Sequence, residues 1–546
     1  MTGAELLVKC LENEGVATIF GVPGEENLDV MDALLDSNIK FIQTRHEQGA
    51  AFMADVYGRL TGKAGVCLST LGPGATNLIT GVADANMDHA PLVAITGQGG
   101  LDRMHKESHQ YMDLVAIFHP ITKWNTQIKK TSVIPEVVRK AFKLAQTEKT
   151  GATHIDLPED IAESVVDGNF NTPLLMQQAY PPSPPIFKVG QAAKIISEAK
   201  YPIILAGNGV ARGHAHEELL RFAETQNIPV AHTFMGKGVI PHTSDLSLFT
   251  IGLQAKDYVS CGFDRADVVI AIGYDIVEYH PSLWNPNRDK KIIHVDMSPA
   301  EVDASYIVSA GVIGDIKSSL EALNEKSTPH NSNLAKNLHD VIAYELHKYE
   351  NDTGFPIKPQ KAISDIRRVM GDDDILISDV GAHKMWIARM YPCMKPNTCL
   401  ISNGFASMGI ALPGALSAKY HFPDKKVLAV TGDGGFLMNS QELETAMRVG
   451  VPFVTLIFND NSYGLIEWKQ MNRFKRASHV NLTNPDFVKY AESFGAKGYK
   501  IHSSDELIPI LNDAFSQKVP SVIDCPVDYS ENLKLTEQFG KLICPI

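Results

Sequence analysis

The sequence lacks the features that mark disulfide-rich, membrane-spanning and nucleic-acid-binding proteins. Its seven cysteines are dispersed with no CxxC pair, which argues against a disulfide framework or zinc site and favours reduced thiols in the cytoplasm. Apolar runs such as residues 268–272 are far shorter than the ~18 residues that a membrane span needs. A formal net charge of −13 leaves no basic excess for binding phosphate backbones. We therefore expect a cytoplasmic protein that binds neither membranes nor nucleic acid.

The length of the chain predicts several domains, and its composition indicates where they meet. At 546 residues the chain exceeds what one hydrophobic core supports, so three or four domains are expected. A Pro-Pro-Ser-Pro-Pro run at 181–185 fits an extended linker, because proline continues neither a helix nor a central strand. A polar stretch from about 325 to 359, with a helical piece at 334–349, marks a second boundary. We predict domains over residues 1–165, 186–325 and 359–546.

Each of these three blocks alternates short apolar runs with amphipathic helical patterns, which is typical of α/β proteins. The runs are followed by Gly, Asn or Asp, and ligands gather at the carboxyl ends of parallel strands. The expected fold class is therefore α/β, with three doubly wound parallel-sheet domains. Six buried strands are predicted, over residues 65–70, 91–96, 202–206, 268–272, 426–430 and 453–458.

The third block contains a glycine-rich turn after one of these strands. Thr431-Gly432-Asp433-Gly434-Gly435-Phe436 follows the strand, and a helix is expected from about Ser440. Glycines at such a turn let backbone N–H groups approach a phosphate, assisted by the dipole of the following helix. A turn of this kind also occurs where it merely closes a βα loop. Taken alone, the turn favours a phosphate-binding site and a plain loop about equally.

A second acidic residue at the end of the next strand adds a metal site to this picture. Asp433 and Asp460 lie 27 residues apart, each at the carboxyl end of one of two successive strands. Mg²⁺ prefers hard oxygen ligands in an octahedron and usually shares them with phosphates. The two carboxylates and the backbone carbonyl of Ser462 would supply three positions. Two helix-capping aspartates would explain either residue, but not the pair.

This Gly-Asp-Gly sequence followed by an Asn-Asp pair resembles the signature of thiamine diphosphate-dependent enzymes. The resemblance implies Asp433, Asp460 and the main-chain oxygen of Ser462 as ligands of Mg²⁺. It also implies a pyrimidine-binding first domain, a central domain and a diphosphate-binding third domain. Residues 378–383 resemble the second diphosphate loop of the family, and residues 402–409 resemble the segment that props the coenzyme into a bent shape. The cofactor-binding residues implied in this domain are Gly381, His383, Ala406, Met408, Gly432, Asp433, Gly434, Gly435, Asp460 and Ser462.

The first domain carries the residues that the same resemblance associates with catalysis. Arg45-His46-Glu47 resembles the family motif whose glutamate bonds to the coenzyme's aminopyrimidine ring and promotes loss of the thiazolium C2 proton. This implies Glu47 as the catalytic carboxylate; as an isolated residue it would equally be a helix-capping acid. Residues 72–77 match the segment that lines the pyrimidine pocket, which implies a role for Asn77.

Similarity appears over the whole chain and points to the acetolactate synthases, in particular the catabolic branch without FAD. Residues 108–113 resemble the loop that brings a glutamine, here Gln110, near the acceptor keto acid, and residues 273–279 and 527–532 resemble the FAD-free branch. The resemblance implies that one pyruvate is decarboxylated and joined to a second to give 2-acetolactate. Other 2-keto acid decarboxylases or carboligases, a pyruvate oxidase with FAD, and a catalytically silent regulatory or assembly subunit are the alternatives.

Two segments leave details of this interpretation open. Gly207 to Gly213 nearly matches a dinucleotide fingerprint but displaces its third glycine by one residue, and we expect a central domain without FAD. The position that favours 2-ketobutyrate in biosynthetic relatives falls on Lys469, with Trp468 one residue earlier, so acceptor preference is open. Since Glu47 and the metal ligands lie in different domains, the resemblance implies active sites shared between subunits. The expected assembly is a homodimer at least, with a tetramer favoured, acting on small 2-keto acids.

Overall fold

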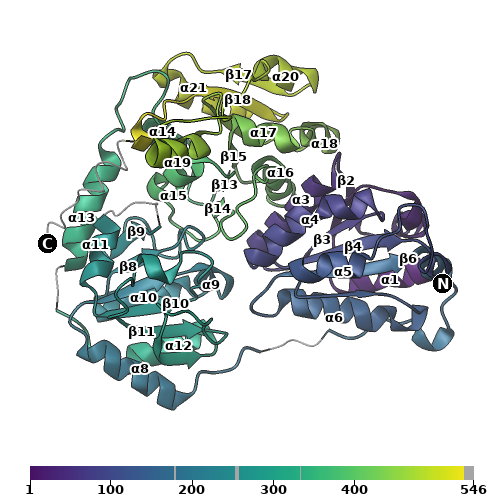
Figure 1. Cartoon of the computed structure of the whole chain (residues 1–546), viewed down its shortest axis with the longest axis horizontal. Helices are drawn as coiled ribbons and strands as arrows, with labels where there is room; N and C mark the ends of the chain where they lie inside the picture. The colour runs from purple at the N-terminus through teal and green to yellow at the C-terminus, as the bar shows by residue number, and fades with distance from the viewer. Residues whose placement is uncertain (177–179, 253–257, 332–333, 534–546) are drawn as a thin grey trace.

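The chain consists of three lobes, each built on a six-stranded parallel sheet flanked by helices (Figure 1). The computed structural model describes residues 1–176, 180–252, 258–331 and 334–533. Every pair of neighbouring strands in the three sheets is parallel. The predicted α/β class with three parallel-sheet domains is confirmed.

The sheet of the first domain has the strand order β2-β1-β3-β4-β6-β5. Its central strands β3 and β4 are buried along their whole length, which explains their continuous apolar runs. Its strands are β1 (Thr18–Gly21), β2 (Lys40–Gln43), β3 (Gly65–Ser69), β4 (Leu92–Gln98), β5 (Trp124–Gln127) and β6 (Ala152–Pro158). Its helices are α1 (Gly3–Asn13), α2 (Leu28–Leu35), α3 (Glu47–Thr61), α4 (Pro73–Met87), α5 (Leu114–Phe118), α6 (Ile134–Gln146) and α7 (Glu159–Glu163).

The central domain has the order β12-β11-β10-β7-β8-β9 and follows the proline-rich linker, which carries no helix or strand. Its strands are β7 (Pro202–Ala206), β8 (Val230–His232), β9 (Ser247–Thr250), β10 (Val268–Ile272), β11 (Lys291–Asp296) and β12 (Val308–Ile313). Its helices are α8 (Ile186–Glu198), α9 (Asn208–Arg212), α10 (His216–Gln226), α11 (Tyr258–Arg265) and α12 (Ile316–Lys326). Helix α13 (Leu334–His347) lies in the polar stretch that precedes the third domain, where a helical piece was predicted.

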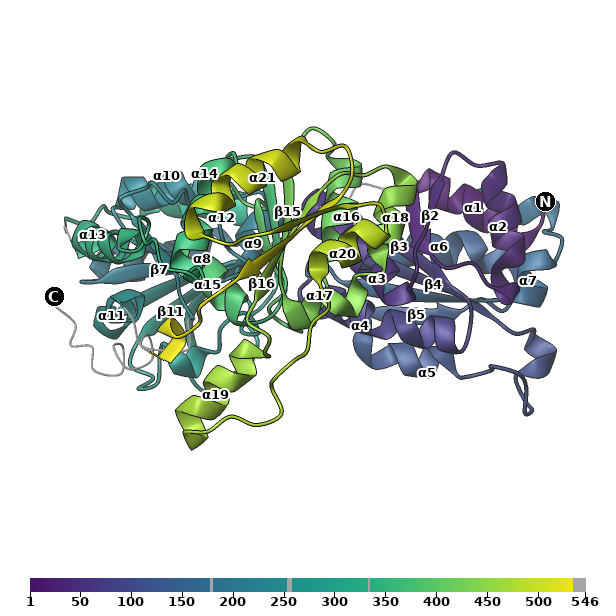
Figure 2. The ribbon, with the colours of Figure 1, turned by 90° about the horizontal axis from the view of Figure 1, so that it is seen from above.

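The third domain has the order β14-β13-β15-β16-β18-β17. Its strands are β13 (Ile375–Ser378), β14 (Cys399–Ile401), β15 (Val427–Gly432), β16 (Val454–Asn459), β17 (Lys497–Lys500) and β18 (Ser521–Pro526). Its helices are α14 (Pro359–Val369), α15 (Ala382–Met390), α16 (Ala411–His421), α17 (Asp433–Asn439), α18 (Glu442–Val449), α19 (Gly464–Phe474), α20 (Phe487–Ser493) and α21 (Leu507–Ser516). Helix α19 projects from the body of this domain (Figure 2).

The helix predicted from about Ser440 is α18, which begins at Glu442, within two residues of the predicted start. A further short helix, α17, precedes it from Asp433 and was not predicted. Gly432 adopts an extended conformation and caps α17, so the chain enters the helix directly from β15. The acidic side chain of Asp433 in the first turn suits the positive end of the helix dipole.

The domains share their hydrophobic cores. Met53 on α3 and Ala415 on α16 belong to one buried cluster, and these two helices pack together across the junction of the first and third domains. Phe249 of the central domain and Trp386 of the third belong to another cluster. Side chains at these junctions are therefore held as firmly as those within a domain.

Two sequence expectations concern the whole chain. Within the described residues, no helix combines the length and apolar character that crossing a membrane requires. Cys261 is disulfide-bonded, so the expectation of reduced thiols is wrong at that position. Five other cysteines have free, buried thiols: Cys10, Cys67, Cys393, Cys399 and Cys525.

Candidate active site

A cavity of about 150 Å³ lies at the carboxyl ends of β13, β15 and β16 in the third domain. Parallel strands bring their carboxyl ends to the same edge of a sheet, which is where α/β proteins collect ligands. All ten cofactor-binding residues predicted in this domain line the cavity, namely Gly381, His383, Ala406, Met408, Gly432, Asp433, Gly434, Gly435, Asp460 and Ser462. These residues come from four separate segments of the sequence, which meet around one space.

The carboxylates of Asp433 and Asp460 lie together at this edge. Burial, together with the charge of the neighbouring Asp433 carboxylate, raises the pKa of Asp460 to about 8. Burial also raises the pKa of Asp433. Two buried carboxylates that repel each other are stabilised when a cation lies between them. This arrangement fits a divalent metal ion.

The remaining ligands of such an ion would have to be oxygens of other kinds. In the described part of the chain, no group of three or more His, Cys, Asp or Glu side chains is suited to hold a metal. Ser462 Oγ lies 2.8 Å from Glu467 Oε2 and donates a hydrogen bond to it, so the serine contribution would come from the main chain. A site with two carboxylates, backbone oxygen and room for phosphate suits Mg²⁺ rather than Zn²⁺.

Glycine is required beside these carboxylates because the backbone approaches them closely. A Cβ atom at Gly464 would lie 2.5 Å from Asp460 Oδ2. A Cβ atom at Gly435 would lie 2.9 Å from Asp379 Oδ2. Neither separation is compatible with a side chain at the glycine. Gly464 and Gly435 therefore allow the carboxylates of Asp460 and Asp379 to keep their positions.

Asp379 and Asn484 support the site and were not predicted from the sequence. The buried carboxylate of Asp379 accepts hydrogen bonds from Gly409 N at 2.8 Å and Thr431 Oγ1 at 2.9 Å, which joins the ends of β13 and β15 to the 402–409 segment. Asn484 Nδ2 donates to Asp433 Oδ2 at 2.6 Å and to Asn461 Oδ1 at 3.1 Å. Asp379 stood within a recognised motif, whereas no sequence pattern marks Asn484.

His383 contributes a hydrogen-bonding group to the cavity that has no protein partner. His383 is 2% exposed, and within the described chain its Nε2 atom has no hydrogen-bond partner. Burial lowers the pKa of His383 to about 3, so the imidazole is neutral. A buried unsatisfied nitrogen is costly, and a polar ligand in the cavity would satisfy it.

The predicted residues of the first domain form a second cluster around the start of α4. Glu47 is the first residue of α3 and is 9% exposed, and its Oε2 accepts a hydrogen bond from Asn77 Nδ2 at 2.9 Å. Gln110 lies in an exposed loop against Gly72, whose Cβ atom would lie 3.0 Å from Gln110 Cβ. None of these three side chains lines the third-domain cavity of the same chain. The structure therefore separates the predicted residues into two groups.

The tryptophan and lysine of α19 lie outside the cavity as well. Trp468 is 7% exposed and packs in the core, whereas Lys469 is exposed to solvent. The cavity is lined instead by Leu465 and Ile466 from the first turn of this helix. In the present conformation, neither Trp468 nor Lys469 contacts the space where a substrate would lie.

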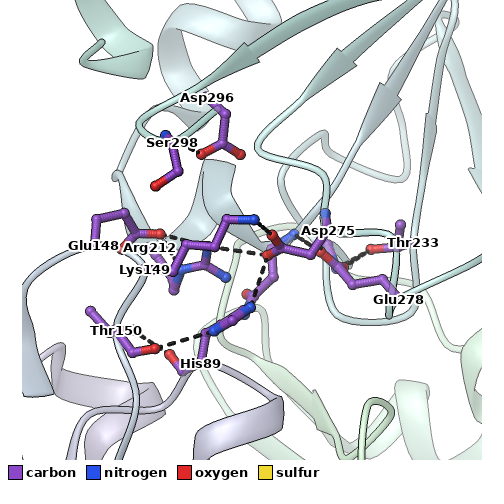
Figure 3. A network of polar contacts seen from close by, with 12 residues as sticks. His89, Glu148, Lys149, Thr150, Arg212, Thr233, Asp275, Glu278, Asp296 and Ser298 are labelled. Carbon is purple, nitrogen blue, oxygen red and sulfur yellow. Dashed lines mark hydrogen bonds and ion pairs between the residues drawn. The ribbon is translucent and has the colours of Figure 1, made fainter. Parts of the chain in front are cut away.

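The glycine-rich turn of the central domain is occupied by a side chain of the protein itself. The buried carboxylate of Glu278 accepts hydrogen bonds from Asn208 N, at 3.1 and 3.2 Å, and from Thr233 Oγ1 (Figure 3). A Cβ atom at Gly207 would lie 2.8 Å from Glu278 Oε1. In dinucleotide-binding folds the diphosphate occupies this turn. The donors that a flavin dinucleotide would need are therefore already engaged.

Beside this turn, a network of ion pairs joins the central domain to the first. Arg212 pairs with Glu148 at 2.6 Å and with Asp275 at 3.3 Å, while Lys149 and His89 also face Asp275 (Figure 3). Burial opposes ionisation of Asp275, but Arg212 and its other cationic neighbours lower its pKa to about 2. Arg212 is thus held between two carboxylates, although its Nη1 atom has no hydrogen-bond partner among the described residues.

Comparisons with known families match all three parts of the chain to one enzyme group. The N-terminal TPP binding domain of thiamine pyrophosphate enzymes matches residues 1–117, and their central domain matches residues 189–323. Their C-terminal TPP binding domain matches residues 379–525, which include both carboxylates of the cavity. Thiamine pyrophosphate is the thiamine diphosphate named above.

Curated relatives extend this similarity over nearly the whole chain. The chain is 37% identical to the acetolactate synthase of Bacillus subtilis, over 99% of this chain and 96% of that protein. It is 36% identical to the catabolic acetolactate synthase of Raoultella terrigena, over 98% of this chain and 97% of the relative. It is also 36% identical to the acetolactate synthase large subunit of Corynebacterium glutamicum, over 96% of this chain and 86% of the relative. The chain therefore belongs to the thiamine pyrophosphate-dependent enzymes, within the acetolactate synthase family.

Proposed function

We propose that this chain forms 2-acetolactate and CO₂ from two molecules of pyruvate, with thiamine diphosphate and Mg²⁺ as cofactors. The observation that carries the proposal is the pair of buried carboxylates, Asp433 and Asp460, at one edge of a cavity lined by all the predicted diphosphate residues. The names of the relatives support the choice of reaction.

The third domain would hold the cofactors. Asp433, Asp460 and the main-chain oxygen of Ser462 would bind Mg²⁺, which in turn binds the diphosphate. The glycine-rich turn would let backbone N–H groups reach the phosphates, and the unpartnered Nε2 of His383 would hydrogen bond to the coenzyme. When bound, thiamine diphosphate supplies a nucleophilic carbon and an electron sink for decarboxylation of a 2-keto acid.

Glu47 would handle the proton that this chemistry requires. Its Oε2 accepts the hydrogen bond from Asn77, and its Oε1 lies on the side of Gly74, where a Cβ atom would be 3.4 Å away. Asn77 thus fixes the orientation of the carboxylate. We assign to Glu47 Oε1 the exchange of a proton with the aminopyrimidine ring.

The lining of the cavity would direct the reaction toward carbon–carbon bond formation. Met408, Phe458, Leu465 and Ile466 surround the space with apolar groups. Exclusion of water removes the protons that would release acetaldehyde instead. Gln110, on its loop beside Gly72, would orient the second keto acid by hydrogen bonding.

A complete active site would need two chains. Glu47, Asn77 and Gln110 do not line the cavity that holds the predicted metal ligands of the same chain. We therefore propose a homodimer in which the first domain of one subunit completes the cavity of the other, and a tetramer made of two such dimers. Light scattering measures whether the protein is a dimer or a tetramer. Activity measured on the same samples tests whether the dimer is needed for catalysis.

Analysis of products distinguishes this proposal from its rivals. Purified protein with thiamine diphosphate, Mg²⁺ and pyruvate should yield acetolactate. Acetaldehyde would indicate a simple decarboxylase, and hydrogen peroxide would indicate a flavin-dependent oxidase, against which the position of Glu278 argues. Absence of any product from pyruvate would refute the proposed reaction. Adding 2-ketobutyrate then measures acceptor preference.

A further inference from the structure

The junction between the first and third domains contains a buried carboxylate that the proposed reaction does not use. Glu442, the first residue of α18, is 0% exposed. Its carboxylate accepts hydrogen bonds from Arg45 N at 3.1 and 3.2 Å and from His46 N at 3.1 Å. Thr445 Oγ1 donates a further hydrogen bond to Glu442 Oε2 at 2.6 Å. A side chain of the third domain thus binds the backbone just before Glu47.

The geometry around this contact restrains the start of α3 from two sides. His46 caps the helix through its side chain, which accepts a hydrogen bond from Gln48 N at 3.1 Å. Asn439 Nδ2, at the end of α17, donates to Gln48 Oε1 at 3.2 Å. Glu442 and Asn439 therefore hold the residues on both sides of Glu47, whose own carboxylate accepts a hydrogen bond from Asn77 within the first domain.

A glycine leaves the space that the carboxylate needs. A Cβ atom at Gly49 would lie 2.8 Å from Glu442 Oε1. Gly49 lies inside α3, where alanine is the better helix former, so glycine here lowers the intrinsic stability of the helix. The close approach of Glu442 accounts for this unfavourable choice.

We propose that Glu442 is a positioning residue for Glu47. The carboxylate fixes the backbone of Arg45 and His46. Because these residues precede Glu47, they fix the direction in which its side chain projects from the first turn of α3. The inference rests on the proposed role of Glu47 as the group that exchanges a proton with the coenzyme. Ionised acceptors form stronger hydrogen bonds to N–H groups than neutral ones, so the charge of Glu442 matters as well as its shape.

The burial of Glu442 supports a specific role. Desolvation raises its pKa to about 7, against the opposing effect of Thr445 and the two N–H donors. A buried carboxylate is expensive, and an apolar side chain would fill the same volume at lower cost. Packing alone therefore does not explain a glutamate at this position.

The test compares Glu442→Gln with Glu444→Gln in the full-length protein. Glu444 is two residues along the same helix and pairs with Arg448 at 3.1 Å on a partly exposed surface. We expect kcat for acetolactate formation to fall about 10- to 100-fold in E442Q, the effect of weakening charge-assisted hydrogen bonds. The KM for pyruvate and the Kd for thiamine diphosphate should stay within about threefold of the wild-type values, because no group that binds them changes. E444Q should match the wild type.

A measurement without cofactors separates this proposal from the proposed function. Hydrogen–deuterium exchange at the Arg45 and His46 amides of cofactor-free protein should be faster in E442Q than in wild type and E444Q. If the wild type forms no acetolactate, the proposed reaction fails, while the exchange result still decides whether Glu442 holds this backbone. Unchanged protection of both amides in E442Q would overturn the proposal.

Gly49→Ala provides a second variant with the charge retained. The added Cβ should displace the carboxylate and lower kcat in the same direction as E442Q, although alanine otherwise favours the helix. The proposal is overturned if G49A or E442Q turns over at the wild-type rate. It is also overturned if the loss in E442Q lies wholly in the Kd for the coenzyme.

Discussion

Arg59 lies at the centre of a buried charge cluster whose removal has a calculable effect on stability. Its guanidinium lies 2.7 Å from Asp55, 2.7 Å from Asp84 and 2.8 Å from Asp88. The Arg59 side chain is 9% exposed, and those of the three aspartates are 0% exposed. Asp84 also accepts a hydrogen bond from Ser402 Oγ at 2.7 Å, so the cluster joins α3 and α4 to the segment that carries Ala406 and Met408.

Replacing Arg59 by methionine keeps much of the side-chain volume but leaves three carboxylates without a cation. Removing one partner of a buried ion pair costs about 3–5 kcal/mol, because the remaining charge is uncompensated. Burial and the nearby Asp55 raise the pKa of Asp84 to about 7 even with Arg59 present. We therefore expect Arg59→Met to lower the free energy of unfolding by about 3–5 kcal/mol at neutral pH.

The pH dependence of this loss follows from the direction of the pKa shifts. Without Arg59, the pKa values of Asp84 and Asp88 in the folded protein, which burial already raises, would rise further above their unfolded values. A buried acid with a raised pKa stabilises the fold when protonated and destabilises it as pH rises through its folded pKa. The deficit of Arg59→Met should therefore be largest near pH 8 and shrink toward pH 5 as the carboxylates protonate.

Urea unfolding of Arg59→Met and wild type across this pH range measures the effect. Lys336→Met serves as the control, because Lys336 and Asp245 form an exposed pair, 58% and 65% accessible. That control should leave the free energy of unfolding nearly unchanged at any pH, because solvent screens an exposed ion pair. If Arg59→Met loses no more stability than the control, or loses more as pH falls, the reasoning about this cluster is wrong.

Three further predictions concern the proposed active site. Asp433→Asn and Asp460→Asn should each weaken Mg²⁺-dependent binding of thiamine diphosphate about 100-fold, since each removes one of two carboxylate ligands. Tryptophan fluorescence titration measures this affinity, with the exposed Asp486→Asn as control. Unaltered affinity would contradict the assignment of the metal ligands. Glu47→Gln should reduce kcat about 100-fold with coenzyme affinity retained; wild-type turnover would refute its role. Protein incubated with FAD and passed through gel filtration should show no flavin absorbance, because Glu278 occupies the diphosphate turn; a retained flavin spectrum would overturn that argument.

Much of the fold could be predicted because its signals are local. Strands such as β10, Val268–Ile272, are buried on both faces, and their apolar runs stand out in the sequence. The gap between Asp433 and Asp460 predicted their meeting, since successive strands β15 and β16 are neighbours in the sheet. Helix α17 was not predicted, because it begins directly from the strand, without the polar cap that marks most helix starts.

The supporting contacts of the site could not be predicted, because they depend on how distant segments approach one another. Asn484 reaches Asp433 across 51 residues, and Glu442 reaches His46 across 396. An asparagine in a loop and a glutamate at a helix start are ordinary residues in sequence, and both have obvious local explanations as turn former and helix cap. Only the packing of the first domain against the third gives Glu442 a different partner.

The difference between contacts set within one sheet and contacts set by domain packing also explains why the two clusters of predicted residues remain separate within one chain. A carboxylate at the end of a strand finds its neighbour through the sheet itself, so Asp433 and Asp460 meet wherever β15 and β16 pair. Glu47 starts a helix of the first domain, which is built on a different sheet, and in the proposed dimer its distance from a cavity would depend on which copy of the third domain it faces. The intrachain contact with Glu442 fixes the helix from which Glu47 projects, while the cavity that Glu47 serves would belong to the neighbouring subunit. Dissociating the dimer by dilution should therefore abolish activity while leaving the protection of the Arg45 and His46 amides unchanged.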